Sequence, residues 1–245
     1  MKTLGIIGCG AIGTLIAEAV EKRLIQCDGL ILHDVDSMRT RKLGKSLRVH
    51  VGIVNSVQEM IRLKPTVIVE AASQEAAKQY VAEIVNAGID VVVMSVGALL
   101  DLRVMSSKIH VPSGAIGGLD AISAANLAGI DEVLLITRKN PNVLDLDNTE
   151  EKIVYEGNAA ESVRRFPREM NVAAALALTV EPDKVKVQVI SDPKVTRNVH
   201  EVKVKWKHGE MLLKFSNDPH PENPKTSALA AWSAIRLLQQ LMQKE

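Results

Sequence analysis

The feature that most constrains the fold is a glycine-rich hexapeptide close to the start of the chain, Gly8-Cys9-Gly10-Ala11-Ile12-Gly13. It directly follows an apolar segment that is typical of a buried strand, Leu4–Ile7, and it opens a helical pattern. In a G-x-G-x-x-G turn, the first glycine permits a tight bend and the second lets a pyrophosphate approach the backbone. The third lets the helix pack closely on the strand. The motif therefore predicts a Rossmann dinucleotide-binding domain.

An acidic residue in the right place strengthens this prediction. Asp34 ends the next predicted strand, 21 residues after Gly13. A carboxylate there accepts hydrogen bonds from the adenosine ribose 2′-OH and disfavours a 2′-phosphate, which favours NAD. Three basic residues follow closely: Arg39, Arg41 and Lys42. They would offset this repulsion if they pointed into the site, but they are explained more simply as the solvent-exposed face of a helix. We therefore expect NAD or NADP as cofactor.

The first hundred residues alternate short apolar runs with helical patterns, as a parallel α/β sheet does. The predicted strands are Leu4–Ile7, Leu30–His33, Thr66–Glu70 and Asp90–Met94. The predicted helices are Ala11–Arg23, Ser37–Leu47, Ser56–Leu63 and Glu75–Ala87.

The pattern changes near residue 110, where a glycine-rich turn leads into a helix at Leu119–Ala128. Several later segments alternate apolar and charged residues, which indicates a partly antiparallel sheet with one face in water. These strands are expected at Glu132–Arg138, Val185–Ile190, Glu201–Trp206 and Met211–Phe215, with covering helices at Ala159–Arg165 and Met170–Leu178. The fold class is thus α/β, with an α+β catalytic and dimerisation domain after the Rossmann domain.

The chain ends in an amphipathic helix predicted at Thr226–Lys244, whose apolar positions need a partner. They are Leu229, Trp232, Ile235, Leu238, Leu241 and Met242. We expect this helix to return to the first domain. The expected domains are residues 1–111 plus 217–245 for the Rossmann domain and 112–216 for the substrate domain.

Composition excludes several function classes. Aromatic residues are only 2% and the net charge is +1, so neither base stacking nor a basic surface supports nucleic-acid binding. No apolar run reaches the length of about 18 residues that a membrane span needs. The two cysteines, Cys9 and Cys27, lack metal-site spacing, which fits free thiols in a reducing cytoplasm and predicts no metal.

The six histidines are the natural candidates for proton transfer near neutral pH. His200 opens an alternating strand beside the polar cluster Thr196-Arg197-Asn198, and His220 lies in a proline-bounded loop. His110 precedes the turn at Pro112, which leaves a role in the cleft or in packing open. His33 lies at a strand end beside the expected adenosine site, which is remote from hydride transfer. His50 and His208 lie in short polar connections, where a solvated side chain is the simplest explanation.

Motifs spread over nearly the whole chain resemble the L-aspartate dehydrogenase family. Besides the glycine turn, they are Glu70-Ala71-Ala72-Ser73, Ser95-Val96-Gly97-Ala98-Leu99, Pro112–Asp120, Phe166-Pro167, Asn171–Ala175, Asn198-Val199-His200-Glu201 and Asn223–Ser227. The resemblance implies oxidation of L-aspartate by NAD(P)+ to iminoaspartate, which hydrolyses to oxaloacetate and ammonia, and the reverse amination. It also implies a homodimer and, in some organisms, supply of iminoaspartate to quinolinate synthesis.

The resemblance also assigns site residues. It implies that His200 is catalytic and that Ala115 and Asn171 contact the nicotinamide end of the cofactor. The predicted cofactor-binding residues are Gly8, Gly10, Ala11, Ile12, Gly13, Asp34, Ala71, Ala72, Ser95, Val96, Gly97, Ala115 and Asn171. Candidate substrate-binding residues are Asn198, His220, Lys225 and Thr226, the last two at the expected start of the final helix.

Two other function classes are compatible with the residues. One is a different two-domain Rossmann enzyme, such as a homoserine dehydrogenase or a dihydrodipicolinate reductase. The other is a non-catalytic NAD(H) sensor, because a fold alone does not determine function. A sensor would bind NADH without turnover and would need no histidine in its cleft.

Overall fold

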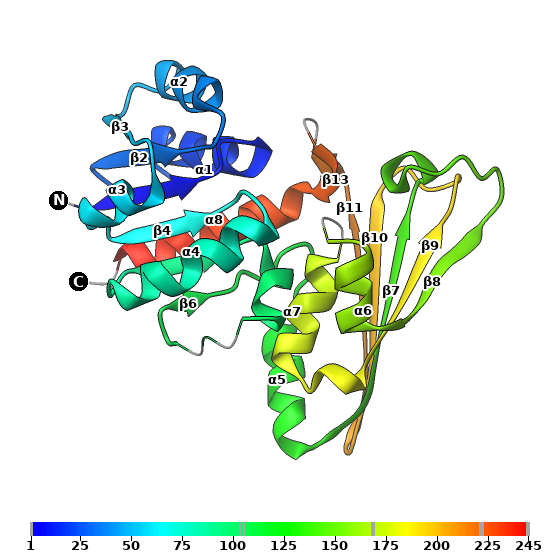
Figure 1. The fold of residues 1–245 in the computed structure, drawn as a ribbon. Coiled ribbons are helices and arrows are strands. Elements are labelled where there is room, and N and C mark those ends of the chain that lie inside the picture. The colour runs from blue at the N-terminus through cyan, green and yellow to red at the C-terminus, as the bar shows by residue number, and fades with distance from the viewer. Residues whose placement is uncertain (1, 103, 105, 168–169, 221–222, 244–245) are drawn as a thin grey trace. The chain divides into compact units, whose positions relative to one another are not determined.

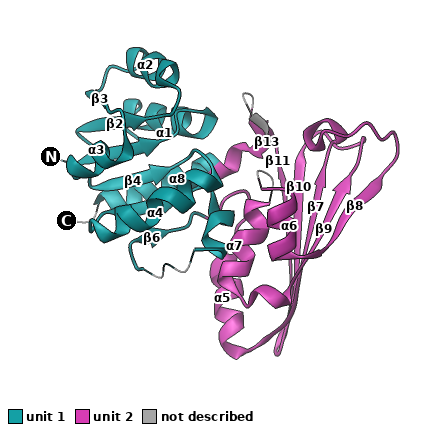
Figure 2. Cartoon of the chain, in the orientation of Figure 1, with its two compact units in different colours: residues 1–112, 231–245 teal, residues 113–230 magenta. Residues whose placement is uncertain are grey.

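The computed structural model describes residues 2–102, 104, 106–167, 170–220 and 223–243. The chain forms two compact units. Unit 1 comprises Met1–Pro112 and Ala231–Glu245, and unit 2 comprises Ser113–Ala230 (Figure 2). Each unit is described separately below.

Unit 1 contains a parallel sheet of six strands in the order β3-β2-β1-β4-β5-β6. This is the strand order of a Rossmann dinucleotide-binding domain, in which the order reverses between β1 and β4. The strands are β1 (Thr3–Ile7), β2 (Gly29–His33), β3 (Val51–Ile53), β4 (Val67–Glu70), β5 (Asp90–Val93) and β6 (Ile109–His110). The helices are α1 (Ala11–Glu21), α2 (Ser37–Ser46), α3 (Val57–Arg62), α4 (Gln74–Asn86) and the short 3₁₀ helix η1 (Val96–Leu100).

The central strands form where the sequence is apolar without interruption. Every residue of β2 and β4 is buried, as expected of strands that are covered on both faces. The edge strands β3 and β6 were not predicted, because they have only three and two residues. Runs of that length carry no recognisable periodicity.

The final helix, α8 (Ala228–Gln243), begins two residues later than predicted. Its second part belongs to unit 1, where Ile235, Leu238 and Met242 are buried. Two hydrogen bonds attach it: Lys2 Nζ donates to the Met242 carbonyl (2.9 Å), and Gln239 Nε2 donates to the Leu24 carbonyl (2.7 Å). The expectation that every apolar position of this helix is buried was wrong, since Leu229 is 36% and Trp232 49% exposed.

Unit 2 contains a mixed sheet in the order β11-β10-β7-β9-β8, in which only the β7–β9 pair is parallel. Its strands are β7 (Ile130–Lys139), β8 (Lys152–Asn158), β9 (Val185–Ser191), β10 (Asn198–Trp206) and β11 (Gly209–Asn217). Helices α5 (Leu119–Ala128), α6 (Ala159–Arg165) and α7 (Asn171–Thr179) lie on one side of this sheet (Figure 1). The short 3₁₀ helices η2 (Pro141–Leu144) and η3 (Pro182–Lys184) connect strands.

The predicted alternation is present in β10, where Val202 and Val204 are buried while Lys203 and Lys205 are exposed. The sheet therefore has a dry face that packs on the helices. The same face also buries polar residues at one end of β7 and β10, and these form the candidate reaction centre described below.

Residues 217–230 belong to unit 2 and not, as we predicted, to the Rossmann unit. They form a hairpin of β12 (Pro219–His220) and β13 (Asn223–Ser227). The Ala228 N–H donates to the Asp218 carbonyl (3.2 Å), and Arg197 pairs with the Asp218 carboxylate (2.8 Å). These bonds tie the segment to the end of β11 and to the residue before β10.

None of the helices in the described ranges is long and apolar enough to cross a membrane.

Candidate dinucleotide site and reaction centre

The three motif glycines occupy positions with the three requirements of a dinucleotide turn. Gly8 has φ +96°, and a Cβ there would lie 2.6 Å from the Ala71 carbonyl oxygen. A Cβ on Gly13 would lie 1.9 Å from the Gly8 carbonyl oxygen, so only glycine allows this close packing of α1. A Cβ on Gly10 would meet nothing within 4 Å. The turn is therefore compact around Gly8 and Gly13 and open at Gly10, which is where a pyrophosphate would approach.

The start of α1 leaves its backbone donors available to a ligand. Gly10 is the N-cap residue and supplies no side-chain hydrogen bond, and Ala11 and Ile12 form the first helical turn. The free N–H groups and the positive end of the helix dipole favour an anion at this position.

Asp34 follows β2 directly and is bound to the glycine turn. One carboxylate oxygen accepts from the Cys9 N–H (2.7 Å) and the other from the Asp36 N–H (2.9 Å). Burial and, to a smaller extent, the Asp34 charge raise the pKa of the Cys9 thiol to about 12, against the opposing charge of Arg39. Cys9 thus remains a protonated thiol, which suits a packing residue and not a nucleophile.

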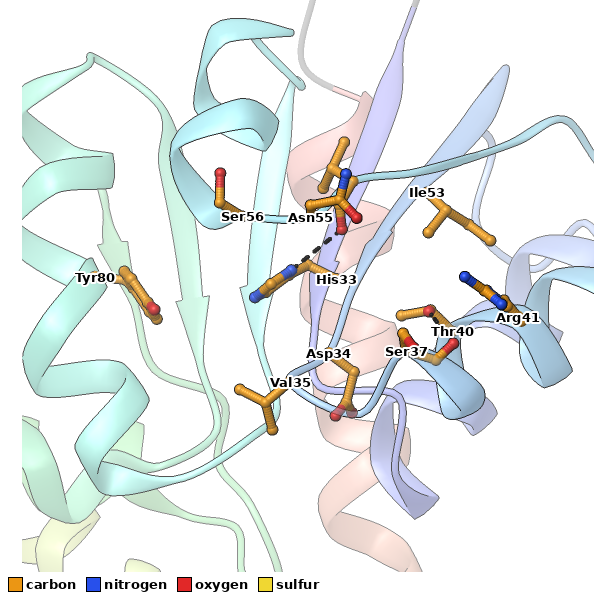
Figure 3. Close-up of a pocket in the computed structure, with 11 residues that line it drawn as sticks. His33, Asp34, Val35, Ser37, Thr40, Arg41, Ile53, Asn55, Ser56 and Tyr80 are labelled. Carbon is orange, nitrogen blue, oxygen red and sulfur yellow. Dashed lines mark hydrogen bonds between the residues drawn. The ribbon is translucent and has the colours of Figure 1, made fainter.

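A cavity of about 380 Å³ adjoins Asp34 (Figure 3). In the view of Figure 3, Ser37, Thr40 and Arg41 of α2 lie on one side of Asp34, while Val35 and Tyr80 lie on the other. The remaining lining residues are His33, Ile53, Val54, Asn55 and Ser56. Of the three basic residues that follow Asp34, Arg41 is the one that lines the cavity, whereas Arg39 pairs with Asp36 (3.6 Å).

A buried carboxylate joins the two loops that follow β4 and β5. Glu70 Oε1 accepts from the N–H groups of Ala72 (2.8 Å) and Ser73 (3.0 Å) and from the Ser95 hydroxyl (3.0 Å). Its Oε2 accepts from the Ser95 N–H (3.1 Å). Burial raises the pKa of Glu70, against the opposing effect of these bonds from Ala72, Ser95 and Ser73.

This arrangement brings the predicted loop residues to the carboxyl edge of the sheet. Ala71 and Ala72 follow β4, and the Ala71 carbonyl lies against Gly8. Ser95, Val96 and Gly97 are buried after β5. The role of Glu70 itself was not predicted, although an acidic residue that ends an otherwise apolar strand is a signal that could have revealed it.

In unit 2, His200 is buried at the paired ends of β7 and β10. It is 3% exposed and faces Thr137 across the two strands. The Thr137 hydroxyl lies 3.1 Å from His200 Nδ1. A hydroxyl can donate to or accept from this nitrogen, and either bond fixes the plane of the ring. Thr137 was not among the predicted residues.

The environment of His200 keeps its ring neutral. Burial and, to a smaller extent, the positive charge of Lys139 lower the pKa of His200 to about 3. Lys139 is two residues beyond Thr137 on β7 and is itself buried. A neutral imidazole has a lone pair with which it can accept a proton, as a general base must.

The turn before α5 is fixed to the same end of the sheet. Asn217 Nδ2 donates to the Ala115 carbonyl (2.9 Å), and Asn217 is paired with Asn198 across β11 and β10. Gly117 approaches Phe215, the residue that pairs with His200 in the sheet. The structure therefore brings Ala115, Asn198 and His200 to one region of unit 2.

The other predicted residues of unit 2 are placed on three elements. Asn171 is the first residue of α7, and His220 is buried on β12. Thr226 lies on β13 and not, as predicted, at the start of a helix. Lys225 lies on the same strand, but its side chain is outside the part of the structure that is described. The final helix does not start at Lys225 and Thr226, because this segment pairs with β12 instead.

Among the described residues, no group of three His, Cys, Asp or Glu side chains is arranged to hold a metal ion. The residues of unit 1, in contrast, fit a dinucleotide: the open position at Gly10, the uncapped start of α1 and the carboxylate of Asp34. Strand order, glycine turn and acidic residue together define a Rossmann dinucleotide-binding domain joined to an α+β domain that contains a buried histidine.

Comparison with known proteins identifies the family. The family model described as "Aspartate dehydrogenase, C-terminal" matches residues 120–241, and that described as "Homoserine dehydrogenase, NAD binding domain" matches residues 8–109. The chain is 44% identical to the L-aspartate dehydrogenase of Methanothermobacter thermautotrophicus, covering 98% of this chain and 96% of the relative. It is 38% identical to that of Archaeoglobus fulgidus, with 97% of each chain covered.

A solved structure agrees. The crystal structure of aspartate dehydrogenase from Thermotoga maritima has a TM-score of 0.77 and 28% sequence identity, covering 100% of this chain and 98% of that one. A myo-inositol dehydrogenase from Corynebacterium glutamicum, with a TM-score of 0.57 and 11% identity, shares the fold alone. The chain belongs to the L-aspartate dehydrogenase family.

Proposed function

We propose that this chain oxidises L-aspartate with NAD(P)+ to iminoaspartate, NAD(P)H and a proton. Water then adds to the imine carbon, and loss of ammonia leaves oxaloacetate. The observation that carries the proposal is the buried, neutral His200 held by Thr137, in a chain whose other unit has a complete dinucleotide turn. The near full-length similarity to L-aspartate dehydrogenases supports it.

In this proposal His200 transfers protons to and from the water and the nitrogen that are bonded to the imine carbon. Water must lose a proton as it attacks, and the departing nitrogen must gain one. An imidazole suits both steps because it exchanges protons near neutral pH once substrate charges surround it. Burial and the Lys139 charge keep the ring neutral before substrate binds, so its lone pair is available.

Unit 1 binds and orients the dinucleotide. A bound dinucleotide would supply the acceptor for the hydride that leaves the substrate Cα. The N–H groups at the start of α1 hold the phosphates beside Gly10, and Asp34 accepts from the ribose hydroxyls. Glu70 holds the loops that carry Ala72 and Ser95, and Ala115 and Asn171 contact the nicotinamide end.

The substrate carries two carboxylates, so its site needs donors and positive charge. We infer that the substrate site includes Asn198, His220, Lys225 and Thr226. Asn198 and His220 are buried polar residues of unit 2, as expected of groups that line a closed site. Lys139, buried beside His200, contributes positive charge.

The test is NAD(P)H formation by the purified protein with each of L-aspartate, L-glutamate, L-alanine and L-homoserine at equal concentration. We expect turnover with L-aspartate at least a hundredfold above the others, and one ammonia released per NAD(P)H formed. Turnover with another amino acid in place of L-aspartate would overturn the assignment. Tight NADH binding without turnover of any substrate would indicate a sensor.

We also infer that the enzyme works as a homodimer in the cytoplasm, apart from nucleic acids and membranes. One face of the unit 2 sheet carries no helix of that unit and includes Leu212, which is 67% exposed, with Leu134 and Ile136 half-buried. Such a face suits association with a second copy. Both cysteines are free thiols, as in a reducing compartment. Light scattering on the protein as it elutes from a size-exclusion column tests the dimer, and the mass of a monomer would contradict it.

We also propose, from the family resemblance, that the iminoaspartate is supplied to quinolinate synthesis.

A further inference from the structure

The ring of His33 is fixed in one orientation at the wall of the cavity beside Asp34. His33 is 7% exposed, and its Nδ1 lies 3.3 Å from the Val54 carbonyl oxygen. A carbonyl oxygen only accepts hydrogen bonds, so Nδ1 must carry the hydrogen. In the neutral ring, Nε2 then has a lone pair and no hydrogen, which makes it an acceptor.

This acceptor faces the cavity. In Figure 3 the second ring nitrogen of His33 points away from the Val54 bond and toward the space between Tyr80 and Val35. All three residues line the same cavity of about 380 Å³. Val35 presents an apolar side chain that is 98% exposed, and Tyr80 is half-buried on α4. The wall of this space therefore includes the apolar side chain of Val35, the side chain of Tyr80 and the acceptor nitrogen of His33.

The identity of the ligand group follows from the position of Asp34. This inference rests on the proposed function, in which Asp34 binds the adenosine ribose. The base is attached to that same ribose, so it must occupy space next to Asp34. Ser37, Thr40 and Arg41 lie on the opposite side of Asp34 from His33 and Tyr80 (Figure 3). We assign the side with the hydroxyls and the guanidinium to the ribose 2′ position, because these groups suit a hydroxyl or a phosphate, and the side of His33 and Tyr80 to the base.

We propose that His33 recognises the adenine base of the cofactor, and that its Nε2 accepts a hydrogen bond from the exocyclic amino group. His33 is thus a specificity-determining residue for the nucleotide base. A hypoxanthine base has a carbonyl oxygen at that position, and this oxygen would face the Nε2 lone pair. Two acceptors cannot bond to each other, and burying both without a donor is costly.

The test compares NADH with its deaminated analogue, nicotinamide hypoxanthine dinucleotide in reduced form, which differs only in the base: a C6 carbonyl replaces the amino group, and N1 carries a hydrogen. Binding is measured by nicotinamide fluorescence at pH 8.5, where free imidazole is neutral. We expect the analogue to bind about tenfold more weakly than NADH, the effect of losing one buried hydrogen bond. Equal dissociation constants would overturn the role of His33 and leave the proposed function intact. Failure of both compounds to bind would overturn both.

A substitution at His33 tests the contribution of Nε2 separately from that of Nδ1. In His33→Asn the side-chain amide can still donate to the Val54 carbonyl, but no acceptor remains at the position of Nε2. We expect this variant to bind NADH about tenfold more weakly and to bind the two dinucleotides equally. His50→Asn, a substitution of an exposed histidine in the same unit, should keep the wild-type ratio. The proposal would be contradicted if the ratio of the two dissociation constants in His33→Asn equalled that of wild type. If this variant does not fold, the comparison of the two dinucleotides on the wild-type protein still tests the proposal.

Discussion

The hydroxyl oxygen of Thr137 lies 3.1 Å from Nδ1 of His200, and the two residues are direct partners on the neighbouring strands β7 and β10. Both side chains are buried on the face of the sheet that packs on helices. The sheet register therefore determines where the ring lies, and the hydrogen bond determines how it is turned.

The first prediction concerns this bond. Thr137→Val keeps a branched side chain but removes the hydroxyl, so the ring of His200 loses its fixed orientation. We expect kcat for L-aspartate to fall about tenfold, the equivalent of one lost hydrogen bond in the transition state, with little change in the dissociation constant of NADH. Thr137→Ser restores the hydroxyl and should recover most of kcat. If the serine variant is as slow as the valine variant, Thr137 acts through packing and not through the hydrogen bond.

The second prediction is a pH dependence of stability caused by His200. Its pKa is about 3 in the folded protein and about 6.5 in an unfolded chain. Between these values the unfolded state binds more protons, so folding stability rises with pH. The contribution is complete above pH 6.5 and is lost as the pH falls toward 3.

We expect the free energy of unfolding to fall by about 2 kcal/mol between pH 6.5 and 5 from this one group. Urea unfolding of wild type and His200→Gln at both pH values measures the difference. The wild type should lose about 2 kcal/mol more than the variant over this interval. If the free energy of unfolding falls equally in the two proteins, His200 has the same pKa in the folded and the unfolded state, which would contradict the prediction.

The third prediction concerns Glu70, whose two oxygens accept four hydrogen bonds from the loops after β4 and β5. Glu70→Gln has nearly the same shape, but its amide group would place donors against donors. The loops that carry Ala72 and Ser95 should then separate, and the dissociation constant of NADH should rise about tenfold or more. Glu210→Gln, at an exposed carboxylate of β11, is the control. An unchanged NADH affinity in Glu70→Gln would confine Glu70 to a structural role.

The fourth prediction concerns the choice between NAD and NADP. Asp34→Ser removes a negative charge from beside the ribose 2′ position, and Arg41→Ala removes the positive charge that lines the same cavity. At a distance of about 4 Å and an effective dielectric of about 20, one charge is worth roughly 4 kcal/mol before screening. We expect Asp34→Ser to shift the ratio of kcat/KM values about tenfold toward NADP, and Arg41→Ala to shift it toward NAD. Lys42→Ala should leave the ratio unchanged, and a shift toward NAD in Lys42→Ala as large as that in Arg41→Ala would mean that only the net charge matters.

The fifth prediction compares two large apolar residues of α8, the buried Leu238 and the partly exposed Trp232. Leu238 is fully buried, and Leu238→Ala should cost about 2–5 kcal/mol of unfolding free energy. Trp232 is larger but 49% exposed, so Trp232→Ala should cost clearly less. Urea unfolding of both variants tests the order. The reverse order would mean that Trp232 is covered in the assembled protein.

Much of the fold could be predicted because its signals are local. The glycine turn must stand between a strand and a helix, and the continuous apolar runs of β2 and β4 can only be buried strands. The edge strands β3, β6 and β8 were missed, since partial exposure leaves them without a regular apolar pattern. Thr226 and Ser227 were misassigned to the final helix because threonine and serine suit a helix start, whereas pairing of β13 with β12 decides their structure.

The site was predictable only in part for a similar reason. Motif residues such as Gly8, Gly13 and Asp34 act through backbone geometry that sequence spacing reveals. Thr137 and Glu70 act through partners that are distant in sequence: Thr137 lies 63 residues from His200, and Glu70 lies 25 from Ser95. Only the strand pairing brings such partners together.

The measurement that tests the central claim most directly is the steady-state rate of NAD(P)H formation from L-aspartate, for wild type and His200→Ala in parallel. We expect the variant to lose at least about a hundredfold in kcat, the usual contribution of general acid–base catalysis, while its dissociation constant for NADH stays within about twofold of wild type. Near-normal turnover by His200→Ala would contradict the account, and His220 would then be the next candidate for the catalytic residue.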